Sequence, residues 1–293
     1  MSKPRKSLAQ NLIWWSLLLL ARSFRLMPHG VALSLGSAVA TVVWSLSGRR
    51  VGEAEARCAR ALRVGSSEAR RIVRLSYVNL GRSLAEVLRF PVIKGKIEKI
   101  VEVHGLENLD RALALGKGVI LLTGHLGNWE LAAAYLGLKG YPIRVVGAEQ
   151  RDDRLTDMLV ELRKGVGVTT IGKGFDLRGA IGCLRHGEIL GVLLDQDAKE
   201  KGVVAPFLGL PASTPYGPVK LAQKLGSPIV PLFIVRRDSA RRHDLHILPP
   251  LEVTADMKAS VTRCNDVISE WIARFPEGWL WLYPRWASTV KGE

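Results

Sequence analysis

From about residue 101 onward, short runs rich in branched aliphatic residues alternate with segments of helical pattern. The runs expected to form strands are 117–122, 143–146, 168–171, 189–194, 229–235 and 246–248. The segments expected to form helices between them are 131–138, 154–164, 177–186, 218–225 and 258–275. Strands that are joined through helices run parallel, and such a sheet is covered by helices on both faces. The sequence therefore predicts an α/β fold with a mainly parallel sheet over residues 101–293.

The first 50 residues are of a different kind, with two apolar stretches flanked by Lys and Arg. Residues 8–21 are almost wholly apolar, but this stretch is too short to cross a membrane comfortably, because a spanning helix needs about 20 apolar residues. Residues 26–47 contain no Asp, Glu, Lys or Arg, so this stretch can span a membrane or dip into it. A secretory signal peptide has a similar pattern, but no small-x-small cleavage site follows Leu20. We interpret residues 1–50 as an uncleaved helical anchor: a span, a shallow hairpin, or an interfacial helix followed by one span.

The formal net charge of +15 is concentrated in the N-terminal third of the chain. Residues 1–100 hold 18 Lys and Arg against 5 Asp and Glu, whereas residues 101–293 hold 24 against 22. Residues 51–100 are expected to form a basic helical region after the anchor. Such an excess points to a polyanionic partner, for which nucleic acid, an anionic membrane surface and an acidic substrate all qualify. The three cysteines are far apart in the sequence, which predicts neither a disulfide framework nor a zinc knuckle.

A candidate catalytic histidine lies where the first of the expected strands ends. His125 follows this strand closely, at the carboxyl end where open α/β sheets bind ligands. Gly124 and Gly127 permit a tight turn, and Asn128 can cap the helix that follows. Glu130 then falls in the first helical turn, from which its carboxylate can reach back toward the imidazole. A carboxylate on one ring nitrogen raises the basicity of the other nitrogen, as a general base for a hydroxyl requires.

Taken alone, His125 also fits a residue that merely ends a strand. Glu130 likewise fits a residue that merely interacts favourably with the helix dipole. The surrounding sequence favours the catalytic interpretation, because residues 124–130 resemble the H-x-x-x-x-[DE] block of the glycerolipid-type acyltransferase superfamily. More narrowly, the chain resembles the bacterial late acyltransferases of lipid A synthesis, which attach lauroyl or myristoyl chains. Further segments similar to that family are 194–197 (Leu-Asp-Gln-Asp), 206–209, 214–217, 221–226, 228–236 and the closing motif 276–286. Two positions depart from its pattern: Tyr283 stands where a His is usual, and Glu277 where an amide is commoner.

The resemblance implies roles for individual residues of this chain. His125, together with Glu130, would activate the hydroxyl of an acceptor, and Arg163 and Asp195 match positions that the family uses near that acceptor. The N–H groups near Gly127 to Trp129, where the helix begins, or Arg163, would stabilise the oxyanion that forms during acyl transfer. The residues expected to bind substrate are Arg163, Asp195, Gln196, Gly127, Asn128, Trp129 and Arg236.

The resemblance also implies the partners of the reaction. Acyl carrier protein is the implied donor, acyl-coenzyme A stays open as a donor, and the implied acceptor is an anionic lipid A precursor. The expected location is the cytoplasmic face of the bacterial inner membrane, and neither a metal nor another cofactor is expected. Another lipid acceptor, such as a lysophospholipid, an aminolipid or a glycosylated phosphoinositide, is the alternative within this reaction class.

Other classes of protein fit the sequence less well. A serine hydrolase would need a G-x-S-x-G elbow and a zinc protease an H-E-x-x-H motif, and neither occurs in the chain. Cys183 and His186 are spaced like a nucleophile and its base, but a buried structural cysteine is the preferred interpretation. His243 and His246 are expected at the surface. A basic membrane or nucleic-acid-binding module would explain the charge, but the basic third lacks the interleaved aromatics that stack on bases, so nucleic acid is not expected as a partner.

Overall fold

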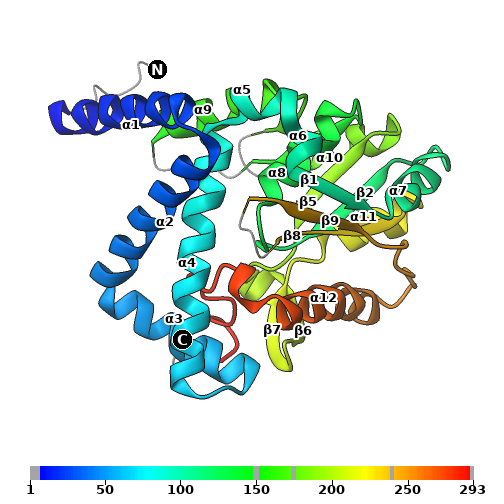
Figure 1. The fold of residues 1–293 in the computed structure, drawn as a ribbon. Helices are drawn as coiled ribbons and strands as arrows, with labels where there is room; N and C mark the ends of the chain where they lie inside the picture. Colours follow the sequence, from blue (N-terminus) through cyan, green and yellow to red (C-terminus); the bar gives the residue numbers. More distant parts are fainter. Residues whose placement is uncertain (1–6, 148–151, 173–175, 238–240, 291–293) are drawn as a thin grey trace.

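A seven-stranded sheet forms the centre of the computed structural model, which describes residues 7–147, 152–172, 176–237 and 241–290 (Figure 1). The strand order is β1-β9-β8-β2-β5-β3-β4. The strands are β1 (Val101–His104), β2 (Val119–Thr123), β3 (Ile143–Val146), β4 (Thr169–Ile171), β5 (Ile189–Leu193), β8 (Ile229–Arg236) and β9 (His243–Ile247). Neighbouring strands are parallel, except that β8 and β9 form an antiparallel pair. The predicted α/β fold with a mainly parallel sheet is confirmed.

Helices cover both faces of this sheet, as expected for buried parallel strands. The covering helices are α7 (Leu106–Leu113), α8 (Trp129–Leu138), α9 (Asp153–Lys164), α10 (Leu177–Arg185), α11 (Gly217–Leu225) and α12 (Met257–Arg274). Side chains of β2 alternate between two cores, because successive residues of a strand point to opposite faces. Ile120 and Leu122 pack with α10, α11 and α12, whereas Val119 and Leu121 pack with α7, α8 and α9.

The N-terminal region consists of four consecutive helices, α1 (Leu8–Leu26), α2 (His29–Leu46), α3 (Gly48–Leu62) and α4 (Ser66–Leu88). α2 and α4 run side by side, and their backbones come closest at Gly36 and Gly81 (Figure 1). A Cβ atom at Gly36 would lie 2.6 Å from the carbonyl oxygen of Gly81, so a larger residue would push the helices apart. Within the described part of the chain, α2 is the one helix long and apolar enough to cross a membrane.

Several elements differ from the sequence-based expectation. A two-stranded antiparallel hairpin, β6 (Val203–Phe207) and β7 (Leu210–Thr214), lies outside the main sheet and was not predicted. Pro206 and Pro211 face each other in it, and proline argues against a strand when only the sequence is known. β9 begins at His243, three residues before the predicted run. The expectation that His243 lies at the surface is wrong, because its side chain is 1% exposed.

The C-terminal segment packs into the core around three buried tryptophans. Trp279 lies edge-on against Trp281 and Trp286, with ring centroids 4.6 and 6.0 Å away, and all three are fully buried. Arg285 is buried beside them and donates to the carbonyl oxygen of Ser213 at 2.6 Å and to the hydroxyl of Thr214. These contacts fix the closing motif against β7, which matters because Trp279 reaches the candidate active site.

Glu86 of α4 is a buried hub that joins the helical region to the sheet. Its carboxylate accepts hydrogen bonds from Arg236 at 2.8 and 2.9 Å and from the Nδ2 atom of Asn128 at 2.8 Å, and it lies 3.0 Å from Nε2 of His243. Burial alone would raise the pKa of Glu86, but the charges and hydrogen bonds of His243 and Arg236 outweigh it and hold that pKa below its usual value. Arg236, which was expected to bind substrate, is therefore committed to an ion pair inside the protein.

Replacing Glu86 with alanine is expected to lower the free energy of unfolding by about 3–5 kcal/mol, because Arg236 would remain buried without its carboxylate. The lowered pKa means that this stabilisation is present above the unfolded pKa of about 4.3 and is lost as the pH falls through the folded value. Denaturant unfolding of the detergent-solubilised chain at pH 7 measures the effect. Glu68→Ala is the matched control on the same helix, because Glu68 pairs with Arg71 in solvent. Equal losses for the two variants would contradict the role of Glu86.

Candidate active site

His125 and Asp195 meet at the carboxyl edge of two adjacent parallel strands. β2 and β5 pair in register, with Thr123 opposite Leu193, so the residues that follow each strand emerge side by side. Oδ1 of Asp195 lies 2.7 Å from Nδ1 of His125, and Oδ2 accepts the backbone N–H of His125 at 2.7 Å. Gly124 leaves room for this contact, since a Cβ atom there would lie 3.0 Å from Oδ2 of Asp195.

The C-terminal segment supplies the third group of this arrangement. Nε1 of Trp279 donates to Oδ2 of Asp195 at 2.7 Å. The backbone on either side of Trp279 is bonded to the histidine turn, because Gly127 N–H donates to the carbonyl oxygen of Gly278 and Leu280 N–H donates to that of His125. The sequence did not assign Trp279 to the site, although its place in the closing motif was the signal that pointed there.

The electrostatics of the site favour a basic imidazole. Burial would lower the pKa of His125, but the charge and hydrogen bond of Asp195, with a further contribution from the charge of Glu130, outweigh it and raise that pKa above its usual value. For Asp195, burial would raise the pKa, but its contacts with His125 and Trp279 lower it. An ionised carboxylate only accepts hydrogen bonds, so Nδ1 of His125 carries the proton and Nε2 is the free acceptor. The ring of Trp129 stands edge-on 4.9 Å from the imidazole.

The expected hydrogen bond between Glu130 and His125 is wrong. Both oxygens of Glu130 accept from Arg163 instead, at 2.8 Å from Nε and 2.5 Å from Nη2, while Asp195 occupies Nδ1 of the imidazole. The guanidinium of Arg163 is buried, and a bidentate carboxylate is the partner that satisfies such a cation best. Glu130 therefore acts on His125 through its electric field rather than by contact.

Substituting Glu130 with leucine is expected to slow the reaction catalysed at this site roughly 10- to 100-fold and to destabilise the fold, since Arg163 would lose its buried partner. The double variant Glu130→Leu with Arg163→Met separates the two effects, because it removes both charges and keeps apolar bulk. We expect the double variant to regain the unfolding midpoint of the wild type but not its catalytic rate. Recovery of both quantities would show that the pair serves only folding. Catalytic rates and denaturant melts of the three proteins provide the measurement.

An apolar pocket of about 40 Å³ lies between α8 and strands β2, β3 and β5. The Glu130–Arg163 ion pair and Trp129 form part of its wall, and the other lining residues are aliphatic apart from Thr123 and Gly191. The carboxylate of Glu130 and the guanidinium of Arg163, which lie beside the histidine turn, therefore border an apolar cavity.

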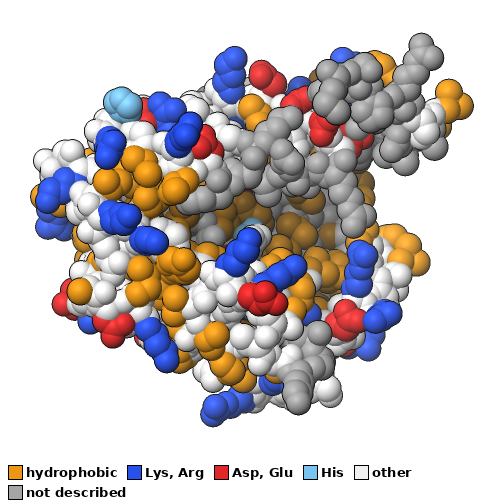
Figure 2. Space-filling view, turned by 180° about the vertical axis from the view of Figure 1, so that it is seen from behind, with side chains coloured by type: hydrophobic (Ala, Val, Ile, Leu, Met, Phe, Trp, Pro, Cys, Tyr) orange, Lys and Arg blue, Asp and Glu red, His pale blue; other side chains and the backbone are white. Residues whose placement is uncertain are grey.

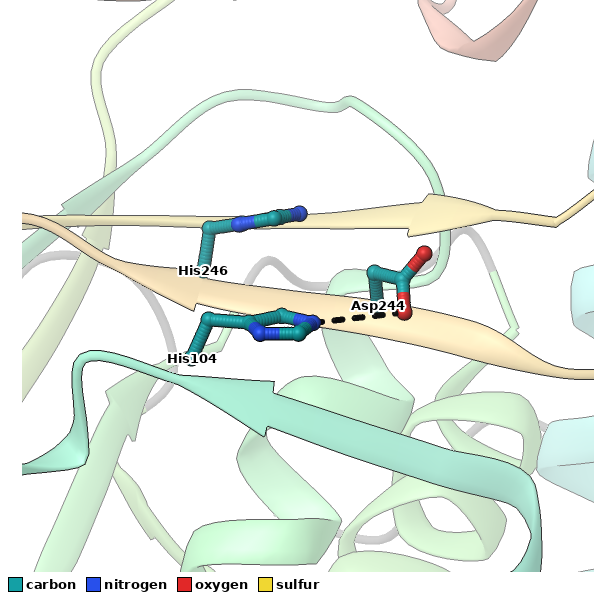
Figure 3. A group of neighbouring side chains, drawn as sticks. All are labelled: His104, Asp244 and His246. Carbon is teal, nitrogen blue, oxygen red and sulfur yellow. Dashed lines mark hydrogen bonds and ion pairs between the residues drawn. The ribbon is translucent and has the colours of Figure 1, made fainter.

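Of the remaining predicted site residues, Asn128 and Gly127 are bonded inside the protein, whereas Gln196 is exposed. Asn128 caps α8 by accepting the backbone N–H of Leu131 at 3.1 Å and donates to Glu86, so both ends of its amide are used inside the protein. The N–H of Gly127 is bonded to Gly278, which corrects its expected role as an oxyanion donor. Gln196, by contrast, is exposed next to Asp195. Among the described residues, one group of side chains has metal-ligand spacing, His104, Asp244 and His246 on β1 and β9 (Figure 3).

Comparison with known proteins identifies similar sequences along the whole chain. The family described as bacterial lipid A biosynthesis acyltransferase matches residues 1–288. The phosphatidylinositol mannoside acyltransferase of Mycobacterium tuberculosis (strain ATCC 25618 / H37Rv) is 27% identical over 224 residues, 74% of this chain and 70% of the relative. The lipid A biosynthesis palmitoleoyltransferase of Escherichia coli (strain K12) is 26% identical over 272 residues, 91% and 88% of the two chains. The lauroyltransferase of lipid A biosynthesis from the same strain is 25% identical over 234 residues, 78% and 76% of the two chains.

Proposed function

This chain belongs to the family of bacterial lipid A biosynthesis acyltransferases, and from that premise we propose that it moves a fatty acyl chain from a thioester to a hydroxyl of a phosphorylated glycolipid, with His125 as the general base. The observation that carries the proposal is the hydrogen-bonded series from Trp279 through Asp195 to Nδ1 of His125. This series leaves Nε2 as the one ring nitrogen able to accept a proton.

The reaction proceeds by direct transfer. Nε2 of His125 takes the proton of the acceptor hydroxyl while the oxygen attacks the thioester carbonyl carbon. The tetrahedral intermediate carries its negative charge on the former carbonyl oxygen, and collapse breaks the carbon–sulfur bond. The leaving thiolate takes up the proton from the imidazolium. Asp195 stabilises this cation while it exists, which is why a buried carboxylate on Nδ1 suits the chemistry.

Two groups are suited to stabilise the oxyanion. The N–H groups in the first turn of α8 have no acceptor within their own helix, and the N–H of Trp129 is such a donor beside His125. Arg163 offers a second positive group at the apolar pocket, where the acyl chain would begin. The orientation of Arg163 is fixed by Glu130, so the spacing of His125 and Glu130 need not bring Glu130 into contact with the imidazole.

The N-terminal helices favour attachment to a membrane surface over a free span. Exposed apolar side chains line α1 and the outer face of α2, and they include Leu12, Trp15 and Val42. The inner face of α2 packs on α4, where Arg82 donates to the hydroxyl of Ser37 at 2.8 Å. A spanning α2 would draw this arginine into the bilayer, which is costly. We infer that α1 and α2 lie in the interface on the cytoplasmic face of the inner membrane.

The exposed charges fit such a surface. Figure 2 shows a face that is hollowed at its centre, with hydrophobic side chains in and around the hollow and Lys and Arg side chains among them. Apolar side chains enter the interface, while cations contact anionic headgroups. Acyl carrier protein is the proposed donor because its acidic surface suits a basic enzyme.

The test is an acyl-transfer assay with the purified full chain in detergent. Radiolabelled acyl groups are offered on acyl carrier protein or on coenzyme A, against tetra-acylated Kdo-lipid A precursor, a phosphatidylinositol mannoside or a lysophospholipid. We expect transfer to the lipid A precursor from acyl carrier protein. Transfer only to another lipid would keep the reaction and overturn the acceptor, and no transfer to any of the three would overturn the proposed function.

A further inference from the structure

The β8–β9 hairpin forms one side of a groove of about 880 Å³ that is strongly basic. Among the described residues that line it, five are arginines and one, Asp244, carries a carboxylate. The arginines are Arg236, Arg237, Arg241, Arg242 and Arg274. Like charges gathered in a concave surface repel one another, so the arrangement favours a ligand of opposite charge.

Two of these arginines have no carboxylate partner within the part of the chain that the structure describes. Arg236 is paired with Glu86, and Arg237 with Asp244 and Glu102. The guanidinium groups of Arg241 and Arg242 have no ion-pair partner among the residues that the structure describes. Among the described groups, the surplus positive charge of the groove therefore lies at its hairpin end, where an anion would meet the guanidinium groups of Arg241 and Arg242.

The cluster of His104, Asp244 and His246 (Figure 3) lies in the same region and suggests a metal, but its surroundings argue against one. Both oxygens of Asp244 accept from Nε of Arg237, at 2.7 and 2.9 Å. The two imidazole rings are stacked, with centroids 4.8 Å apart and planes at 19°. A divalent cation here would also face the arginines of the groove. The charge of the site selects an anion.

The hairpin that lines the groove stands at the catalytic edge of the sheet and contacts the proposed membrane helix. β8 runs parallel to β2, so the hairpin after β8 emerges at the same edge of the sheet as His125. At the other side, the guanidinium of Arg241 lies against the first turn of α2, since a Cβ atom at Gly30 would be 2.9 Å from its Nη2 atom. A headgroup held here would belong to a lipid whose chains lie beside α2.

We propose that this arginine groove binds a phosphate group of the acceptor lipid, with Arg241 and Arg242 as its specificity-determining residues. The inference rests on the proposed acyl transfer to a phosphorylated lipid. Guanidinium groups bind phosphate through paired charge-assisted hydrogen bonds, and the phosphate would hold the headgroup while its hydroxyl reaches Nε2 of His125. The groove thereby gives the enzyme a physical means to prefer phosphorylated acceptors.

The kinetic test compares Arg241→Ala/Arg242→Ala with the wild type on the bisphosphorylated lipid A precursor and on its dephosphorylated form. We expect the double variant to raise KM for the phosphorylated acceptor about tenfold or more while kcat changes less than twofold, since uniform binding is lost. With the dephosphorylated acceptor, the two proteins should have the same KM. Arg178→Ala/Arg185→Ala removes equal charge from the exposed surface of α10 and should leave KM unchanged.

Three results would overturn the proposal. They are an unchanged KM in the double variant, an equal rise for both acceptors, or a rise in KM for acyl carrier protein instead of the lipid. A binding assay separates this proposal from the proposed function, because it needs no turnover. Wild type in nanodiscs should retain the bisphosphorylated lipid better than the dephosphorylated one, and the double variant should not. Inorganic phosphate is added as a competitor to test whether free phosphate alone occupies the groove. If a low concentration of phosphate displaced the lipid, a lipid-specific site would be excluded.

Discussion

Replacing His125 with alanine is expected to lower the acyl-transfer rate by about 10²–10⁴-fold, the range that a lost general base produces. The imidazole is the group whose Nε2 accepts the hydroxyl proton, and no other described histidine lies on Asp195. The fold should survive, because Asp195 keeps the N–H of Trp279 and the backbone N–H of residue 125 as donors. The rate loss therefore reports chemistry rather than unfolding.

The measurement is kcat/KM in the detergent assay, together with a thermal melt followed by circular dichroism. His186→Ala is the matched control, because His186 is an exposed histidine before the amino end of β5, opposite the end that carries Asp195, and its Nδ1 donates to the carbonyl oxygen of Gly182. We expect the control to transfer acyl groups at the wild-type rate. If His125→Ala kept more than a third of the wild-type rate with an unchanged melt, the general-base mechanism would be wrong.

The position of His125 was predictable from the sequence because it depends on local features. An apolar run ending in a glycine turn places the next polar residue at the carboxyl edge of a parallel sheet. Asn128 was also predicted correctly as the cap of α8, since capping is decided within three residues. These predictions needed no knowledge of distant parts of the chain.

The partner of His125 was not predictable in the same way. Glu130 is five residues away in the sequence, whereas Asp195 is 70 residues away and meets the imidazole through the register of β2 with β5. Register between strands is a tertiary property, which the residues around His125 do not encode. The contact with Trp279 depends in turn on the packing of the C-terminal tryptophans.

The burial of His243 agrees with the alternation of residues along β9. Along β9, residues His243, Leu245 and Ile247 are buried and alternate with less buried positions. The period of two assigns His243 to the same face as the two aliphatic residues, even though its neighbours are polar. The pattern does not reveal why a histidine is tolerated at this buried position. The reason is the carboxylate of Glu86 on α4, which lies 3.0 Å from Nε2 of His243.

Replacing Asp195 with asparagine is expected to reduce transfer by about 10²–10⁴-fold at neutral pH while the fold is retained. Asparagine has nearly the same shape and its oxygen still accepts the Trp279 N–H. It no longer stabilises the imidazolium, and its amide can donate to Nδ1 and so put the ring proton on Nε2, where the base must be free.

The pH dependence distinguishes this effect from simple misplacement. A general base works when it is deprotonated, so the wild-type rate should rise with pH through the pKa of His125, which Asp195 holds above its usual value of about 6.5. Removing the carboxylate charge lowers that pKa, so the acid limb of the Asp195→Asn profile should move to lower pH while the plateau falls. Asp197→Asn is the control, because Asp197 is bonded to Ser288 and Lys199 rather than to the imidazole. An acid limb that stays at the wild-type position in Asp195→Asn would mean that Asp195 does not set the basicity of His125.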